Sequence, residues 1–444
     1  MGMITYDYAT TERGLFYSLA LLVLALPGDL ALAAYLLLTH FDLSVSHGDF
    51  ASGSAIGYEN LIRLAVVPAV LWFRLRKVSA PVPEFDKLRR TWFLLAFYAI
   101  LSIWWSPYPF SGVKVAGYLC VYGFLFMILT RAVRAGWVTF RCLACALWGA
   151  LAIAVIQTHV LGNFEGTGDE LVFSERFTSF ASAPSFAGFL LALGVAMFFI
   201  RRSGLALYFS LAGAVIGIVM SGSRGVFTGM LAAILLMAVL LPRKNRKRVS
   251  LRLAARQLLI GATISILAIT LVIHFAPVSR INELIDSSGD LSDVGSFAWR
   301  VALYEKALSD ISSFSIQNVV TGMGSGSGGG VKLAVLRGFD FDTVDGARVF
   351  HNEFLHAGYE WGLIGLVLLI AIYGQLAVAS FHSGVRRGEG PGLAAVSIFP
   401  ALTFSLLFEN VLADAGGAGG TAFTLVFALA AISASYKRSV AEGD

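Results

Sequence analysis

The chain has 444 residues, of which 57% are hydrophobic and only 14% are charged. This composition excludes an ordinary soluble protein, because apolar runs of membrane-crossing length recur along the whole chain. The net charge of +5 becomes informative only when the basic residues are assigned to the two sides of a membrane. We therefore predict an all-α polytopic membrane protein; a β-barrel would show short segments of alternating hydrophobicity instead.

The apolar runs predict about twelve transmembrane helices. They cover approximately residues 15–38, 60–73, 91–106, 113–130, 137–160, 183–200, 204–221, 225–241, 257–275, 357–380, 391–412 and 420–435. Pro27 interrupts the first run and Pro68 lies within the second. Because proline removes a backbone donor and clashes with the preceding turn, we predict a kink at both positions.

The basic residues predict the orientation of these spans, because Lys and Arg accumulate on the cytoplasmic side. Under a twelve-span arrangement most of the 33 basic residues follow even-numbered spans, so both termini are predicted to be cytoplasmic. The densest block includes Arg-Lys-Asn-Arg-Lys-Arg at 243–248. At the end of a membrane helix such a block is a topology determinant that contacts anionic lipids, so no nucleic-acid partner is expected.

This arrangement divides the chain into three regions. Residues 1–275 hold spans one to nine, 276–350 form one large outer segment, and 351–444 hold spans ten to twelve. Within the outer segment, residues 303–308 predict a short helix, and 321–330 (TGMGSGSGGG) are interpreted as a flexible glycine tract. The tract is not a P-loop, because no Gly-Lys-Ser/Thr ends it. Loop flexibility or a backbone contact to substrate is the expected role.

The most informative stretch is 351–365 (HNEFLHAGYEWGLIG), where ionisable side chains directly precede an apolar run of lipid length. Read as one helix, His351, Leu355, Gly358, Gly362 and Gly365 share one side. The three glycines would allow another helix to approach closely. A neutral histidine at the mouth of a helix can act as a base on a hydroxyl nucleophile. The structural alternative is a histidine that caps the helix.

Two arginines on the predicted outer side oppose the topology rule. Arg224 stands in SGSRG (221–225), a small-residue break between two apolar runs. An arginine at that depth is costly and usually faces a polar cavity, where it binds an anion; the alternative is a snorkelling arginine that ends the helix. Arg300, in FAWR (297–300), is less distinctive, because solvated loop arginines are common. Two guanidinium groups can hold a diphosphate bidentately without a metal.

Four segments together resemble the O-antigen ligase and O-antigen (exopolysaccharide) polymerase superfamily of bacterial membrane glycosyltransferases. In chain order they are RFTSF to PSFAGFL (176–190), SGSRG (221–225), WR with VTGMG (299–324), and HNEFL with EWGLIG (351–365). The fourth segment is the most specific, and the order matches that of the family. The chain departs from the family in having Ala183-Pro184-Ser185, where Asn-Pro-Asn is frequent.

The resemblance implies a metal-independent, cofactor-free transferase of the bacterial inner membrane whose active site faces the periplasm. It would move a glycan from an undecaprenyl-diphosphate-linked donor to an acceptor hydroxyl, with inversion at the anomeric carbon. The resemblance assigns His351 as the catalytic residue, and Arg224 and Arg300 as the diphosphate-binding residues. Further outer-side or helix-end ionisable residues are candidates for a supporting role: Arg176, Arg348, Glu353, Glu360 and Glu409.

Alternatives remain at two levels. A polymerase and a ligase share the donor and differ in the acceptor, which is another repeat unit or a lipid A-core oligosaccharide; the absence of any feature for a core acceptor favours the polymerase. A lipid-linked glycan transporter is the alternative from another class, disfavoured because the ionisable residues cluster at one face. Asp340-Phe341-Asp342 resembles the Asp-x-Asp metal motif of other glycosyltransferases, but we interpret it as a solvated acidic turn.

Overall fold

The computed structural model describes residues 2–41, 61–78, 83–158, 164–167, 170–173, 183–201, 203–244, 295–331, 352–382, 390–408 and 422–429. The first half of the described chain contains α1 (Gly2–Ala25), α2 (Gly28–Leu38), the π-helical η3 (Ile62–Val66), α4 (Val67–Leu75), α5 (Pro83–Ser102), the 3-10 helix η4 (Ile103–Trp105), α6 (Pro109–Arg134) and α7 (Phe140–Ile156). The second half contains α8 (Ala183–Ile200), α9 (Leu205–Met220), α10 (Arg224–Lys244), α13 (Gly295–Ser312), α14 (Ile316–Thr321), α16 (Glu353–Phe381) and α17 (Gly390–Phe408). Residues 422–429 are also helical.

The predicted helices coincide with observed ones wherever the structure describes the chain; 257–275 lies outside the described residues. The predicted interruption at Pro27 is present, because Pro27 separates α1 from α2. At Pro68 the backbone stays helical from the π-helical η3 into α4, so a kink there stays a prediction. By length and composition, α6 and α16 are the described helices able to cross a bilayer, whereas α2, α7 and α9 are apolar but shorter. The number of spans and their orientation stay predictions.

One short hairpin departs from the all-α prediction. The strands β1 (Phe164–Thr167) and β2 (Glu170–Phe173) pair antiparallel, with Thr167 opposite Glu170. Two residues, Gly168 and Asp169, connect them. A glycine-containing two-residue connection is a hairpin signal, and a search for membrane-length apolar runs does not detect it. The hairpin falls in the connection between the predicted fifth and sixth spans.

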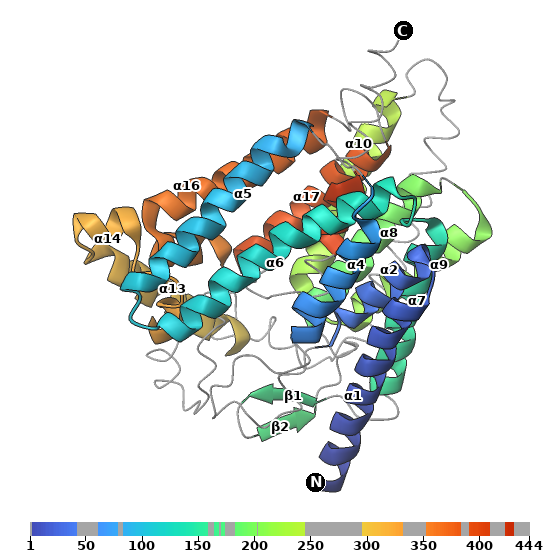
Figure 1. The fold of residues 1–444 in the computed structure, drawn as a ribbon, viewed down its shortest axis with the longest axis horizontal. Helices are drawn as coiled ribbons and strands as arrows, with labels where there is room; N and C mark the ends of the chain where they lie inside the picture. Colours follow the sequence, from blue (N-terminus) through green and yellow to red (C-terminus); the bar gives the residue numbers. More distant parts are fainter. Residues whose placement is uncertain are drawn as a thin grey trace, which may run out of the picture.

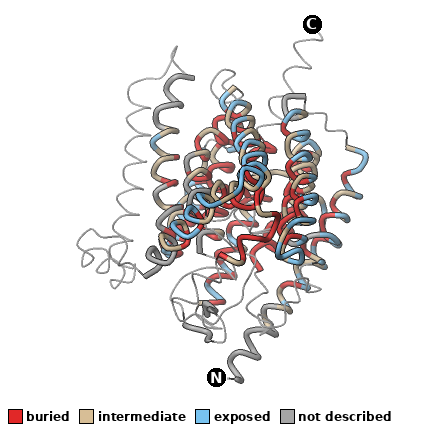
Figure 2. The backbone as a smooth tube through the Cα atoms, turned by 90° about the vertical axis from the view of Figure 1, so that its left-hand side faces the viewer, coloured by how far each residue is buried: buried red, intermediate tan, exposed pale blue. Residues whose placement is uncertain are grey.

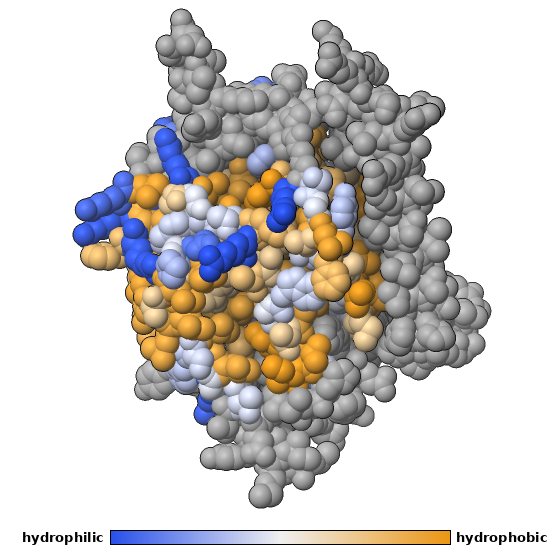
Figure 3. All heavy atoms as spheres, turned by 90° about the vertical axis from the view of Figure 1, so that its right-hand side faces the viewer, coloured by the Kyte–Doolittle hydropathy of each residue, from blue (hydrophilic) through white to orange (hydrophobic). Residues whose placement is uncertain are grey.

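The helices pack around a shared interior (Figures 1 and 2). Buried residues follow the inner sides of the helices, and α10 packs against α17 while α8 packs against α9 and α17. Large apolar side chains also face outward: Trp104 is 95% exposed and Phe110 is 88% exposed. Figure 3 shows apolar side chains over much of the described surface of one face. Such a surface suits contact with lipid better than contact with water.

Helix α6 connects two chemically different ends of the bundle. At one end, the guanidinium carbon of Arg131 lies 3.7 Å from the ring centroid of Trp72, and that of Arg74 lies 5.4 Å from Trp137. At the other end, Gly112 contacts the backbone of Ser325. Gly112 and Arg131 are separated by about 28 Å along a straight helix. The arginines assigned to the cytoplasmic side therefore lie far from the glycine tract.

Helices α5 and α16 lie side by side (Figure 1) and run antiparallel. Thr91 and Gln375 hydrogen-bond near one end of the pair, with 3.0 Å between Gln375 Nε2 and Thr91 Oγ1. Near the other end, Trp361 and the end of α5 share a network described below. Helix α16 is broken at Gly362, whose φ of 61° and ψ of −159° are not helical. The segment after the break, 363–381, is about 28 Å long, close to the roughly 30 Å of a hydrocarbon core.

Candidate active site

The first segment of α16 begins with a side-chain cap. Asn352 Oδ1 accepts a hydrogen bond from Leu355 N at 3.0 Å, and Asn352 has an extended backbone conformation. This is the usual arrangement of an N-cap residue, which satisfies a backbone donor that has no partner within the helix. His351 lies outside the described residues. Since Asn352 is the capping residue, the sequence places His351 one position before the cap.

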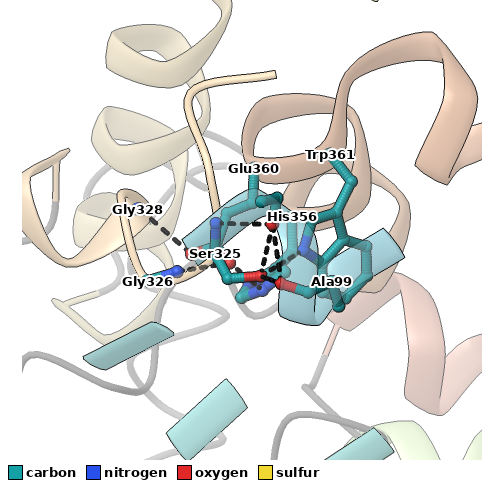
Figure 4. A network of polar contacts seen from close by, with 8 residues as sticks. Ala99, Ser325, Gly326, Gly328, His356, Glu360 and Trp361 are labelled. Atoms are coloured by element: carbon teal, nitrogen blue, oxygen red, sulfur yellow. Dashed lines mark hydrogen bonds and ion pairs between the residues drawn. The ribbon is translucent and has the colours of Figure 1, made fainter. Parts of the chain in front are cut away.

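A fully buried ion pair lies one turn further along α16. His356 Nε2 is 3.2 Å from Glu360 Oε2, and both side chains are inaccessible to solvent. Glu360 also accepts hydrogen bonds from Gly326 N at 2.8 Å and from Gly328 N at 3.1 Å (Figure 4). Successive backbone N–H groups in a glycine turn form a concave anion-binding nest. Here the protein's own carboxylate fills the nest, so these two amides contact Glu360 and not a substrate.

The same glycine segment completes the hydrogen bonding of α16 at its break. Because the helix stops at Gly362, the carbonyl groups of Tyr359 and Glu360 lose their partners four residues on. Met323 N donates to Tyr359 O at 3.0 Å, and Gly324 N donates to Glu360 O at 2.8 Å. The segment thus caps the first part of α16 from outside the helix.

Ser325 fastens the glycine segment to α5. Its backbone N donates to Ser102 Oγ at 3.0 Å, and its hydroxyl donates to Ala99 O at 2.8 Å. The hydroxyl also accepts from Trp361 Nε1 at 2.8 Å (Figure 4). Ser325 is completely buried. One small side chain therefore joins the end of α5, the glycine segment and α16.

The expected flexibility of the glycine tract is wrong. Residues 322–330, which we call the glycine turn, are mostly buried, and three of the glycines have positive φ: 74° at Gly322, 91° at Gly324 and 83° at Gly326. A Cβ atom on Gly324 would lie 2.5 Å from Ser102 O, and one on Gly326 would lie 2.3 Å from Gly112 N. Glycine is needed here for left-handed backbone and close packing.

The predicted helix at 303–308 is part of α13, which packs against the first segment of α16. A small apolar cluster includes Leu303 and Ala307 of α13 together with Tyr359 of α16. Tyr359 also hydrogen-bonds to Asp310 in α13. Through these contacts and the glycine turn, α13 and α14 form one packed unit with residues 352–361. The helix that contains Arg300 is therefore tied to the segment that follows His351.

The predicted site residues fall into three groups. Arg224 is the first residue of α10, four residues after the end of α9, and Arg300 lies in α13, with the side chains of both outside the described part. Glu353 and Glu360 are buried in α16. The remaining candidates lie outside the described residues: Arg176, Arg348, His351 and Glu409.

Three expectations about α16 change with the structure. The proposed shared face of 351–365 is wrong, because the helix breaks at Gly362 and the periodicity stops there. The close approach at Gly362 is real, but the approaching chain is the backbone of Val320 and Gly322 and not another membrane helix. Glu360, expected in a supporting role, binds His356 and the glycine turn. The i,i+4 spacing of His356 and Glu360 was the available sequence signal.

These features define a class of protein: a bundle of mostly apolar helices with a buried polar network at the start of α16. Residues 207–370 match the family model described as O-antigen ligase. The resemblance is therefore confirmed for the three segments within this range, 221–225, 299–324 and 351–365, and the chain carries an O-antigen ligase family domain over it. The matched range includes Arg224, Arg300, His351 and the glycine turn. A comparison with curated proteins found no match.

The match indicates a general activity. O-antigen ligase family proteins are membrane proteins that transfer glycans, so the domain at 207–370 supports a membrane glycan-transfer function.

Proposed function

We propose that the protein transfers a glycan from an undecaprenyl-diphosphate-linked donor to an acceptor sugar hydroxyl at the periplasmic face of the bacterial inner membrane. The observation that carries the proposal is the family match over 207–370, which contains Arg224, Arg300 and His351 in one domain. The proposal includes the twelve-span, N-in and C-in arrangement. It also includes a role for 276–350 as the periplasmic segment.

The reaction assigns one task to each residue. His351 takes the proton of the acceptor hydroxyl as its oxygen forms a bond to the anomeric carbon. The bond between that carbon and the diphosphate breaks, and its electron pair leaves with undecaprenyl diphosphate. Arg224 and Arg300 bind the diphosphate and stabilise the charge that develops on it, so this mechanism requires no metal. Attack opposite the leaving group inverts the anomeric configuration.

The polymerase is favoured over the ligase, because the sequence has no feature that singles out a lipid A-core acceptor. Each enzyme predicts a different product from the same donor. The polymerase forms longer glycans on undecaprenyl diphosphate, and the ligase forms glycan joined to lipid A-core. A transporter would move the labelled lipid across the membrane without chemical change.

The experiment uses purified full-length protein with lipid-linked donor, with and without a lipid A-core acceptor. We expect elongated lipid-linked glycan with donor alone. His351→Ala should reduce its formation by about 10²–10⁴-fold, and Arg224→Ala or Arg300→Ala by about 10²–10³-fold. His382→Ala is the matched histidine control, because His382 caps the far end of α16. Arg89→Ala is the arginine control, because Arg89 is exposed and pairs with Asp86.

Full transfer by His351→Ala or by either arginine variant would show that the substituted residue is not part of the active site. Lipid movement without a new glycosidic bond, unaffected by His351→Ala, would favour the transporter.

A further inference from the structure

Glu360 stands out because its carboxylate is fully buried, accepts hydrogen bonds from two backbone amides and lies beside His356. Gly326 N and Gly328 N each bind a different carboxylate oxygen, and His356 Nε2 contacts the oxygen that Gly326 binds. Burying an ion pair is costly and seldom adds net stability over an apolar replacement. A buried pair with matched donors therefore points to a requirement for defined geometry.

The donors come from a segment far from Glu360 in the sequence. The glycine turn directly follows α14, which is joined to α13, the helix that contains Arg300. Glu360 itself lies nine residues after His351 in the sequence. The Glu360 carboxylate thus connects the α13–α14 part of the chain, which contains Arg300, to the start of α16, which follows His351.

The other contacts across the junction between the glycine turn and α16 involve neutral groups or backbone. Met323 N and Gly324 N bind carbonyl groups of α16, and Ser325 binds Trp361. Glu360 is the side chain in this junction that accepts from two amides of the turn at once. A glutamine would offer one acceptor oxygen and would direct an NH₂ group at an amide N–H or at His356. One buried amide would then lose its partner.

We propose that Glu360, held by His356, is a positioning residue that fixes the α13–α14–glycine turn unit against the start of α16 and so sets Arg300 relative to His351. This inference rests on the proposed function. Glu360 does not touch the substrate in this role.

The test is a kinetic double-mutant cycle with purified full-length protein, measuring kcat and the donor KM separately. Glu360→Gln should lower kcat about ten- to hundred-fold, because misplacement of a catalytic group by about 1 Å costs up to about 10²-fold. The donor KM should change by less. Glu360→Asp, which keeps the charge but shortens the reach, should retain an intermediate kcat and serves as the second variant if the glutamine protein does not fold.

Arg300→Lys supplies the second side of the cycle, because it keeps the charge but loses the bidentate geometry. If Glu360 acts through Arg300, Glu360→Gln should cost at most a few-fold more in the Arg300→Lys background. Hydrogen exchange of the amides in 322–331 should rise in Glu360→Gln. Thr91→Val is the matched control, because it removes a different tie between α5 and α16 and should leave kcat and this exchange unchanged.

A normal kcat in Glu360→Gln and Glu360→Asp, or a loss of the same factor in both backgrounds, would overturn the positioning role. If Arg300→Lys reduces transfer and Glu360→Gln does not, the positioning fails while the proposed function stands. If Arg300→Lys and His351→Ala both transfer normally, the proposed site fails, and the positioning role fails with it.

Discussion

Gly362 and Gly322 lie back to back, and neither has room for a side chain. A Cβ atom on Gly362 would lie 2.4 Å from Gly322 N, and one on Gly322 would lie 2.5 Å from Gly362 N. Both residues have positive φ, 61° and 74°. The break in α16 and the entry to the glycine turn therefore form a single joint, made from two glycines that are 40 positions apart in the sequence.

Gly362→Ala should destabilise the protein strongly. Its φ and ψ lie in a region that is essentially restricted to glycine, and the added methyl group would meet the backbone of Val320 and Gly322. We expect a loss of about 1–3 kcal/mol from the backbone strain alone, seen as a lower midpoint of thermal unfolding in detergent. Gly374→Ala in the same helix is the control, because no atom lies within 4 Å of its added Cβ. A Gly362→Ala protein as stable as Gly374→Ala would contradict this joint.

Ser325→Ala should leave the buried indole N–H of Trp361 without its acceptor. An unpaired buried donor costs about 1–3 kcal/mol, so the midpoint of unfolding should fall. The double variant Ser325→Ala/Trp361→Phe removes donor and acceptor together. Its loss of stability should be smaller than the sum of the two single losses. Strict additivity would show that the hydrogen bond adds nothing to the stability of the folded protein.

The positions of the helices could be predicted from the sequence because membrane-length apolar runs are a strong local signal. Pro27 likewise revealed the interruption between α1 and α2, since proline acts on its own turn. A helix mouth near His351 was predicted as well, although the predicted span began at residue 357 and α16 begins at Glu353. Asn352 then proved to be the cap, and asparagine is among the preferred residues at that position.

The packing of the glycine turn could not be predicted in the same way. Consecutive glycines read equally as a flexible linker or as left-handed backbone under tight packing, and only long-range contacts separate the two. Ser325 meets Ser102 and Ala99 across more than 220 residues, and no local pattern encodes that pairing. The hairpin at Phe164–Phe173 was missed because its signal has a period of two residues over a very short length.

Removal of divalent metal should leave glycan transfer unchanged. The proposed mechanism neutralises the diphosphate with Arg224 and Arg300, so no Lewis acid is needed. We expect the same kcat in excess EDTA as in magnesium-containing buffer. Asp340→Asn and Asp342→Asn, which remove the Asp-x-Asp carboxylates outside the described residues, should also retain transfer. Strong inhibition by EDTA that magnesium reverses, together with loss of activity in these variants, would favour a metal-dependent transferase.

Cysteine labelling can test the predicted orientation, because the two ends of the bundle carry exposed positions. Ile316 in α14 is 86% exposed and lies in the predicted periplasmic segment. Arg134 ends α6 at the opposite end and is also exposed. Single cysteines at these positions would be introduced after replacement of Cys120, Cys142 and Cys145 by alanine.

A membrane-impermeant thiol reagent should label Ile316→Cys in intact spheroplasts, and Arg134→Cys only after the membrane is permeabilised. The basis is the concentration of basic residues at the Arg134 end, since Lys and Arg are retained on the cytoplasmic side. The cysteine-free protein is the control for background labelling. Labelling of Arg134→Cys in intact spheroplasts, with Ile316→Cys protected, would show that the topology is the reverse of the predicted one. It would place the glycine turn and the start of α16 on the cytoplasmic side, away from a periplasmic donor.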